Sequence, residues 1–207
     1  MDPDREWWLR VPAVFLSPKS VFVALRNDSR EDLEARSEPV LALVCLAGIA
    51  VALGTSTARS LYDNVEYDAL LVAVWAVIAG GFVAFTGYFI VGGALYLGVR
   101  GLGSIGSFQR ARHILGFAVA PLALSLFLLW PVELALFGTD RFRRYGSDDG
   151  AAGRVFDVLE LGFVVWSAAL LLVGVRAVHG WTWGRSLAAL GLVALFLAAL
   201  SYINTLL

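Results

Sequence analysis

Cysteine, histidine and charge are all scarce in this 207-residue sequence. The single cysteine, Cys45, cannot form an internal disulfide, and His113 and His179 lie too far from it and from each other to suggest a metal-ligand cluster. Charged residues make up only 16% of the chain, against about 25% in soluble domains. The net charge of −1 offers no electrostatic footprint for nucleic acid. We therefore expect no metal site and no nucleic-acid partner.

Catalytic signatures are also missing. The turn between Gly103 and Gly106 lacks the Gly-Lys-Ser/Thr ending of a phosphate-binding loop. No Gly-x-Ser-x-Gly segment is present, and neither Ser104 nor Ser107 has an evident base and acid to activate it. The sequence therefore predicts a protein without a catalytic residue or a cofactor, and so not an enzyme.

Apolar residues, in contrast, make up 59% of the chain and give it a mean hydropathy of +0.75. The charges cluster between long apolar runs, whereas a soluble core would intersperse them at helical spacing. We predict an all-α polytopic membrane protein, with a membrane domain over residues 39–207 after an N-terminal segment of residues 1–38. Its five transmembrane helices are expected at about residues 39–58, 69–99, 114–137, 155–175 and 186–207. The second run has 31 uncharged residues, so it exceeds the roughly 30 Å hydrocarbon core and should tilt.

The N-terminal segment, residues 1–38, has an amphipathic pattern. Trp7 and Trp8 open a short apolar patch, and Ser17-Pro18 has the residue types of a helix start. This pattern predicts one or two short helices lying in the membrane interface, with both tryptophans at headgroup depth. Packing of the same apolar stripe on the membrane domain is an equally good interpretation. Because the basic and apolar regions of a signal peptide are missing, targeting is expected to rest on the first span.

Basic residues are unevenly distributed around the five predicted spans. With the N-terminus inside, 11 of the 16 lysines and arginines lie on the inner side and five on the outer side. The positive-inside rule therefore predicts a cytoplasmic N-terminus. The four arginines of the third loop oppose this orientation, because they would lie outside.

The first candidate site follows the glycine-rich turn on the predicted inner side. Gly103, Gly106 and Ser107 form a flexible turn with Ser107 as a helix N-cap, and Pro121 should kink the third span, so these four residues are candidate structural hinges. Basic and aromatic residues nearby are candidates for binding an anionic lipid or a protein partner: Arg110, Arg112, His113, Trp7 and Trp8. Ordinary positive-inside anchoring is the favoured explanation of the three basic residues.

The second candidate site joins the third and fourth spans on the predicted outer side. It consists of the carboxylates at the span ends and the arginines of the connecting loop: Glu133, Arg141, Arg143, Arg144, Arg154, Asp157 and Glu160. Ionisable groups near hydrocarbon are costly unless paired, so we expect at least one arginine–carboxylate contact, with Glu160 as the main partner. An ion-pair network is favoured over a pathway for a substrate or coupling ion.

Four short segments stand in an order found in a known family. They are Leu16-Ser17-Pro18 with Val21-Phe22 and Leu25, Gly103 to Phe108 with Arg110, Gly116 to Pro121, and His179-Gly180-Trp181 with Arg185. With them the chain resembles the Ypt-interacting-protein (Yip) domain family. The resemblance implies a five-helix domain with a cytoplasmic N-terminus, here of the prokaryotic type and in the cytoplasmic membrane. Eukaryotic members are linked to vesicle traffic and Rab-type GTPases, a role that the short N-terminal segment argues against.

Two functions remain in competition. The resemblance, the small residues spaced for helix packing and the missing catalytic signatures favour a non-catalytic membrane scaffold or adaptor. Its expected partners are the lipid bilayer, an anionic lipid, and a protein partner or a second copy of the chain. The alternative is a small transporter or lipid-binding protein that uses the carboxylates of the second site. A membrane enzyme acting at that site is the weakest option.

Overall fold

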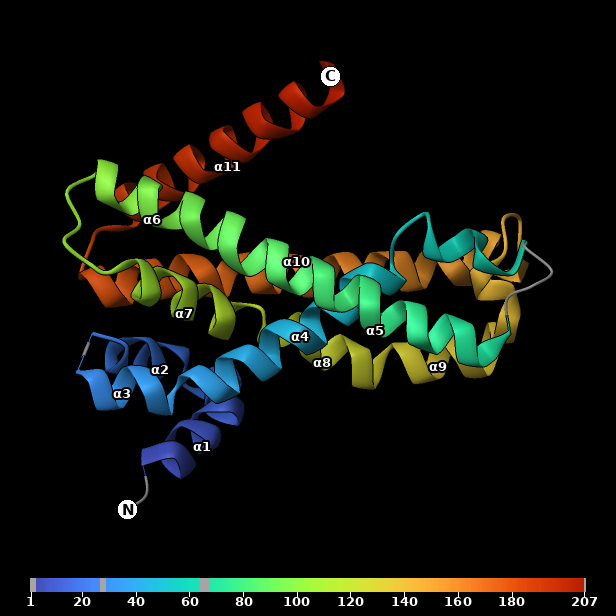
Figure 1. Cartoon of the computed structure of the whole chain (residues 1–207), viewed down its shortest axis with the longest axis horizontal. Helices are drawn as coiled ribbons and strands as arrows, with labels where there is room; N and C mark the ends of the chain where they lie inside the picture. Colours follow the sequence, from blue (N-terminus) through green and yellow to red (C-terminus); the bar gives the residue numbers. More distant parts are fainter. Residues whose placement is uncertain (1–2, 27–28, 64–67, 207) are drawn as a thin grey trace. The chain divides into compact units, whose positions relative to one another are not determined.

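The structure is a computed structural model, which describes residues 3–26, 29–63 and 68–206. These residues form helices and turns, and no strand occurs among them. Five helical segments are long and apolar enough to cross a membrane: Glu31–Leu53, Ala69–Gly101, Phe108–Phe142, Ala151–His179 and Trp183–Tyr202. The predicted all-α fold with five membrane helices is therefore confirmed (Figure 1).

Short helices precede the first span. They are α1 (Pro3–Leu16), α2 (Pro18–Ala24) and α3 (Arg30–Ala35), and α4 (Ser37–Leu53) follows them. Pro18 occupies the first position of α2, where the missing N–H costs nothing, and the Ser29 side chain caps α3 by accepting from the backbone N–H of Asp32. The helix α4 ends five residues before the expected Ala58, because the chain turns at Gly54 and the Thr55 hydroxyl donates to the carbonyl of Ala52.

The second and third spans are each built from three consecutive helical pieces. The second contains α5 (Ala69–Thr86), the π-helical η2 (Gly87–Val91) and α6 (Gly92–Gly101), and the third contains α7 (Phe108–Ala118), α8 (Ala120–Leu128) and α9 (Trp130–Phe137). The break between α7 and α8 falls at Val119, two residues before Pro121, because a proline supplies no N–H and its ring crowds the preceding turn. Pro131 likewise follows the break between α8 and α9.

The last two spans are single continuous helices, α10 (Ala151–His179) and α11 (Trp183–Leu206). The charge-free part of the fourth span is too short to cross a bilayer alone, and α10 extends it at both ends, taking in Asp157 and Glu160 and continuing past Arg176. Gly180, at a φ of 64°, makes the turn from α10 towards α11. The short helices η1 (Ala58–Asp63) and η4 (Ser147–Asp149) lie in the connections, and η3 (Gly138–Phe142) ends the third apolar segment.

The chain divides into two compact units, so that α4 and α10 each contribute residues to both. Unit 1 comprises residues 1–42, 86–118 and 168–207, and unit 2 comprises residues 43–85 and 119–167. The candidate site around Arg110 belongs to unit 1 and the one around Glu133 to unit 2.

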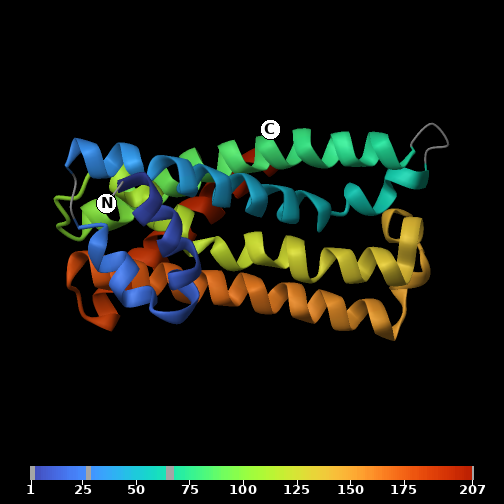
Figure 2. The same ribbon diagram turned by 90° about the horizontal axis from the view of Figure 1, so that it is seen from below.

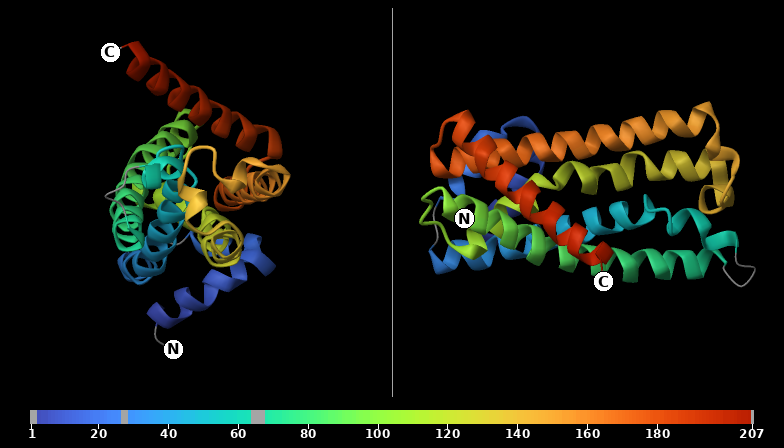
Figure 3. Two further views of the ribbon diagram at one scale, coloured as in Figure 1. Left: turned by 90° about the vertical axis from the view of Figure 1, so that its right-hand side faces the viewer. Right: turned by 90° about the horizontal axis from the view of Figure 1, so that it is seen from above.

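In unit 1, the N-terminal helices bury an apolar side against α7 and the end of α10 (Figure 2). The ring of Trp7 is buried and lies 5.8 Å from that of Phe117, and Phe22 is fully buried. A Cβ on Gly174 of α10 would come within 2.9 Å of Phe22, so only glycine permits this approach. The helix α11 crosses α6 at a second close contact, where Gly98 faces the carbonyl of Ala189 (Figure 3).

In unit 2, small side chains bring α4 and α5 together. Ala76, Gly80 and Ala84 recur four residues apart and are all buried. A Cβ on Gly80 would lie 2.6 Å from the Cα of Ile49, and one on Gly48 would lie 2.4 Å from the carbonyl oxygen of Gly80. The spacing therefore gives helix-to-helix contact of the kind that small residues provide in membranes.

Candidate functional site

A buried ion pair forms the centre of the site in unit 2. Glu133 lies on α9 and Arg141 on η3, and the positive φ of Gly138, 56°, turns the chain back between them. The Nε of Arg141 donates to Oε2 of Glu133 at 2.5 Å, and the two side chains are 3% and 0% exposed. The Arg141 guanidinium carbon also lies 5.2 Å from the centre of the Trp130 ring. The loop thus folds back over the end of its own helix.

Arg141 also faces two further carboxylates. Its Nη1 lies 3.3 Å from Asp148 and its Nη2 lies 3.4 Å from Glu160 of α10. Each end of the guanidinium therefore meets a carboxylate, in agreement with the planar donor geometry of arginine. This one cation ties together α9, η4 and α10.

Arg59, from η1, brings a second cation to the same group. It binds Asp157 at 2.5 Å and lies 3.8 Å from Asp148. Burial lowers the pKa of Arg59, but the hydrogen bond and charge of Asp157, with the charges of Asp148 and Glu160, raise it above its usual value, so the guanidinium stays charged. We call the whole group the charged cluster: Arg59, Glu133, Arg141, Asp148, Asp157 and Glu160.

The structure brings together some of the residues expected at this site and leaves others apart. Glu133, Arg141, Asp157 and Glu160 all belong to the charged cluster. The shortest contact of Arg141 is to Glu133, however, and the contact to Glu160 is longer. The remaining three arginines form no ion pair with the charged cluster: Arg143 is exposed, Arg144 pairs with Asp63 at 3.6 Å, and Arg154 borders an apolar pocket with Val155, Val158 and Leu159.

Sequence reasoning missed Arg59, Asp63 and Asp148. Arg59 did offer a signal, because it is the only basic residue in its loop and that loop is expected on the same side as the charged cluster. Asp148 stood among several loop charges with no pattern to single it out.

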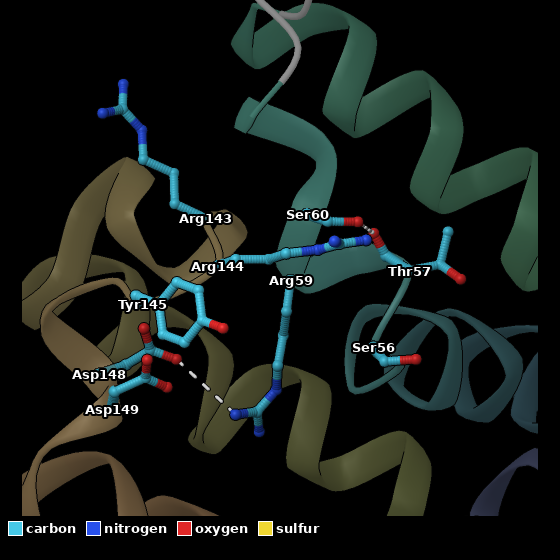
Figure 4. A pocket seen from close by; sticks show the side chains of 9 residues that line it. All are labelled: Ser56, Thr57, Arg59, Ser60, Arg143, Arg144, Tyr145, Asp148 and Asp149. Carbon is cyan, nitrogen blue, oxygen red and sulfur yellow. Dashed lines mark hydrogen bonds and ion pairs between the residues drawn. The ribbon is translucent and has the colours of Figure 1, made fainter.

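A polar cavity of about 590 Å³ borders the charged cluster (Figure 4). Its lining combines hydroxyl groups with charges of both signs: Ser56, Thr57, Arg59, Ser60, Arg143, Arg144, Tyr145, Asp148 and Asp149. In Figure 4, Arg59 points towards Asp148, whereas Arg143 points away from the other side chains. These groups can form hydrogen bonds to a polar ligand, and the described lining contains no histidine or cysteine that would suggest a nucleophile or its base.

In unit 1, the three basic residues expected near the glycine turn do not converge on one site. Arg112 lies among the rings of Tyr88, Phe89 and Phe108, with its guanidinium carbon 4.6–4.8 Å from their centres. Arg110 donates to the backbone carbonyl of Arg26 at 2.9 Å. Each side chain is therefore engaged separately by the protein.

The third of them, His113, is 1% exposed and accepts a hydrogen bond at Nδ1 from Nε of Arg36 at 2.6 Å. Arg36 is itself fully buried, with its guanidinium carbon 5.7 Å from the centre of the Trp7 ring. Trp7 is 2% exposed and Trp8 is 42% exposed, so the two tryptophans have different environments. This buried arrangement around Arg36 was not expected from the sequence.

The glycine turn has the local geometry that its residues require. Gly103 has a φ of 85°, and the Ser107 hydroxyl accepts from the backbone N–H of Arg110 at the start of α7. Ser104 accepts from the backbone of Gly106, and its hydroxyl lies 3.2 Å from Nδ1 of His179 at the end of α10. The turn is thus held in place by hydrogen bonds to its own residues and to α10.

A comparison with known protein families agrees with the resemblance noted from the sequence. A model of the Yip1 domain matches residues 13–203, nearly the whole chain. The chain belongs to the Yip1 domain family. No curated protein and no solved structure gives a significant match. Family membership and the five apolar helices together identify this Yip1-domain protein as an integral membrane protein.

Proposed function

We propose that this Yip1-domain protein is a non-catalytic membrane scaffold or adaptor that acts through protein or lipid partners. The observation that supports this role is the internal pairing of its buried charges. Arg141 pairs with Glu133, Asp148 and Glu160, and Arg36 bonds to His113. Paired groups hold helices and loops together and need no substrate to explain them.

The alternative, a small transporter or lipid-binding protein, is supported by two oxygens of the same cluster. Oε1 of Glu133 and Oδ1 of Asp148 are buried and accept no hydrogen bond from the described residues. The polar cavity borders Asp148, and its described lining residues all lie between the candidate spans. A second cavity, of about 380 Å³, has a mainly apolar lining that includes Val72, Ala76 and Trp130. An apolar recess among span residues is less suited to carrying a polar solute.

Replacing Glu160 with glutamine distinguishes the scaffold proposal from the transporter alternative. We expect Glu160→Gln to lower the free energy of unfolding by about 1 kcal/mol, because a contact to a charged group is weakened. We expect no change in the flux of protons or small solutes across liposomes that contain the purified chain, since a scaffold carries none. The exposed Asp149→Asn serves as the control for loss of a carboxylate charge. Flux in the unmodified protein that Glu160→Gln abolishes at unchanged stability would support the transporter.

We also propose that the N-terminus is cytoplasmic, in the cytoplasmic membrane of a prokaryotic cell. The distribution of 11 basic residues inside and five outside supports this orientation. Reporter fusions after residue 64 and at the C-terminus should both report the outer side. A C-terminal fusion that is active in the cytoplasm would reverse the assignment.

A further inference from the structure

A small pocket lies where α2 meets the end of α10, both within unit 1. It has a volume of about 140 Å³ and is lined by Lys19, Val23, Arg26, Arg176, Ala177, Gly180 and Trp181. Three of these residues are cationic and none is acidic, in contrast to the mixed charges of the larger cavity in unit 2. The charged groups that line this small pocket are thus all positive.

The two arginine side chains of the pocket are held by contacts that leave their charges unneutralised. Nε and Nη2 of Arg26 both donate to the carbonyl of Ala177, which fixes the guanidinium against the end of α10. The guanidinium carbon of Arg176 lies 4.5 Å from the centre of the Trp183 ring. A carbonyl and an aromatic ring orient a cation without removing its charge. The pocket is therefore arranged before any ligand enters.

The electrostatics of this arrangement favour an anion. Among the described residues, Lys19, Arg26 and Arg176 form no ion pair. The Nε of Arg176 is buried and donates to no described partner, although a buried donor without a partner is costly. An anion in the pocket would relieve the repulsion among the three cations.

The size and position of the pocket narrow the class of anion. A volume of 140 Å³ corresponds to roughly four or five water molecules at about 30 Å³ each, which suits one compact anionic group. Arginine matches the geometry of phosphate oxygens. The pocket also lies at the end of a membrane-spanning helix, where phospholipid headgroups are found.

We propose that this pocket binds a phosphate-bearing anion through Lys19, Arg26 and Arg176. The phosphate can belong to an anionic phospholipid or be free in solution, and both sources offer the same oxygens to the same three cations. This binding site goes beyond the proposed scaffold role and does not depend on it.

The test measures binding to the full chain in nanodiscs of a neutral lipid, so that no surface potential attracts the probe. Short-chain phosphatidylglycerol is titrated in one arm and inorganic phosphate in the other. Lys19→Gln and Arg176→Gln should each weaken binding about fivefold, and the double variant about 25-fold. Lys19→Arg should retain binding, because it keeps the charge. Arg26 is left intact, because it also links α2 to α10.

Arg100→Gln is the matched control, because it removes one positive charge from unit 1 outside the pocket. It should change binding less than twofold. Saturable binding in the lipid arm alone identifies a phospholipid site, and equal binding in both arms identifies a site for free phosphate. If Arg100→Gln weakens binding as much as Lys19→Gln, or if neither probe binds the folded unmodified protein, the proposal is wrong.

Discussion

Replacing Arg141 with methionine will lower the free energy of unfolding by about 3–5 kcal/mol. The substitution removes the cation that faces Glu133, Asp148 and Glu160, and Glu133 is 0% exposed. Its carboxylate would then be left buried without its cation, which costs far more than the loss of a surface pair. Methionine keeps an apolar stem, so the effect reports mainly the loss of the guanidinium, including its contact with the Trp130 ring. Unfolding of the purified chain by titration with sodium dodecyl sulfate provides the measurement.

Two further variants show whether the buried pair is the cause. Arg143→Met removes an exposed arginine two residues away and should change the stability by no more than about 0.5 kcal/mol. Adding Glu133→Gln to Arg141→Met should recover part of the loss, because the uncompensated charge is gone. If Arg141→Met and Arg143→Met have equal effects, the ion pair does not stabilise the protein.

Some contacts of the charged cluster could be predicted from the sequence, and others could not. The position of Glu133 at one span end and Glu160 near the start of the next follows from the apolar runs, because helices joined by a short loop are usually antiparallel neighbours. The apolar runs do not predict that Arg141, rather than a neighbouring arginine, pairs with these carboxylates. Four arginines share the loop predicted from the sequence, and the backbone turn at Gly138 directs Arg141 back towards α9.

Contacts between segments far apart in the chain were harder still to foresee. Arg59 and Asp157 are 98 positions apart in the sequence, and nothing in the local pattern of either segment predicts that they form a contact. The apolar stripe containing Trp7 was visible in the sequence, but the pattern fitted the membrane interface and the protein surface equally well. Only the structure shows that Trp7 packs against Phe117. Periodicity identifies which side of a helix is covered and does not identify what covers it.

Acidic residues surround Arg36 in the sequence, a pattern that is typical of a solvated stretch. In the structure the first membrane-spanning segment begins at Glu31, and Arg36 lies between α3 and α4 with no exposed surface. A segment of mixed charge can therefore contain one buried charged residue, which the average composition of the segment does not reveal.

Replacing Arg36 with methionine is the second substitution with a large expected effect, a loss of about 3 kcal/mol. It removes the donor to Nδ1 of His113, which is 1% exposed, and the guanidinium near the Trp7 ring. The buried imidazole would then lack this donor, and the position cannot fill with water as a surface site does. Titration with sodium dodecyl sulfate again measures the free energy of unfolding.

Arg10 provides the matched control, because its guanidinium carbon also lies over the Trp7 ring, at 4.1 Å, but its side chain is partly exposed. Arg10→Met should cost about 1 kcal/mol or less, which separates the cation–π contact from the buried hydrogen bond. The second variant changes the acceptor. His113→Asn places an oxygen near the position of Nδ1 and should retain more stability than His113→Leu, which has no acceptor for Arg36. Two outcomes would contradict this prediction: an equal loss of stability for His113→Asn and His113→Leu, or for Arg36→Met and Arg10→Met. Either would show that the hydrogen bond between Arg36 and His113 contributes little to holding α7 against the N-terminal helices.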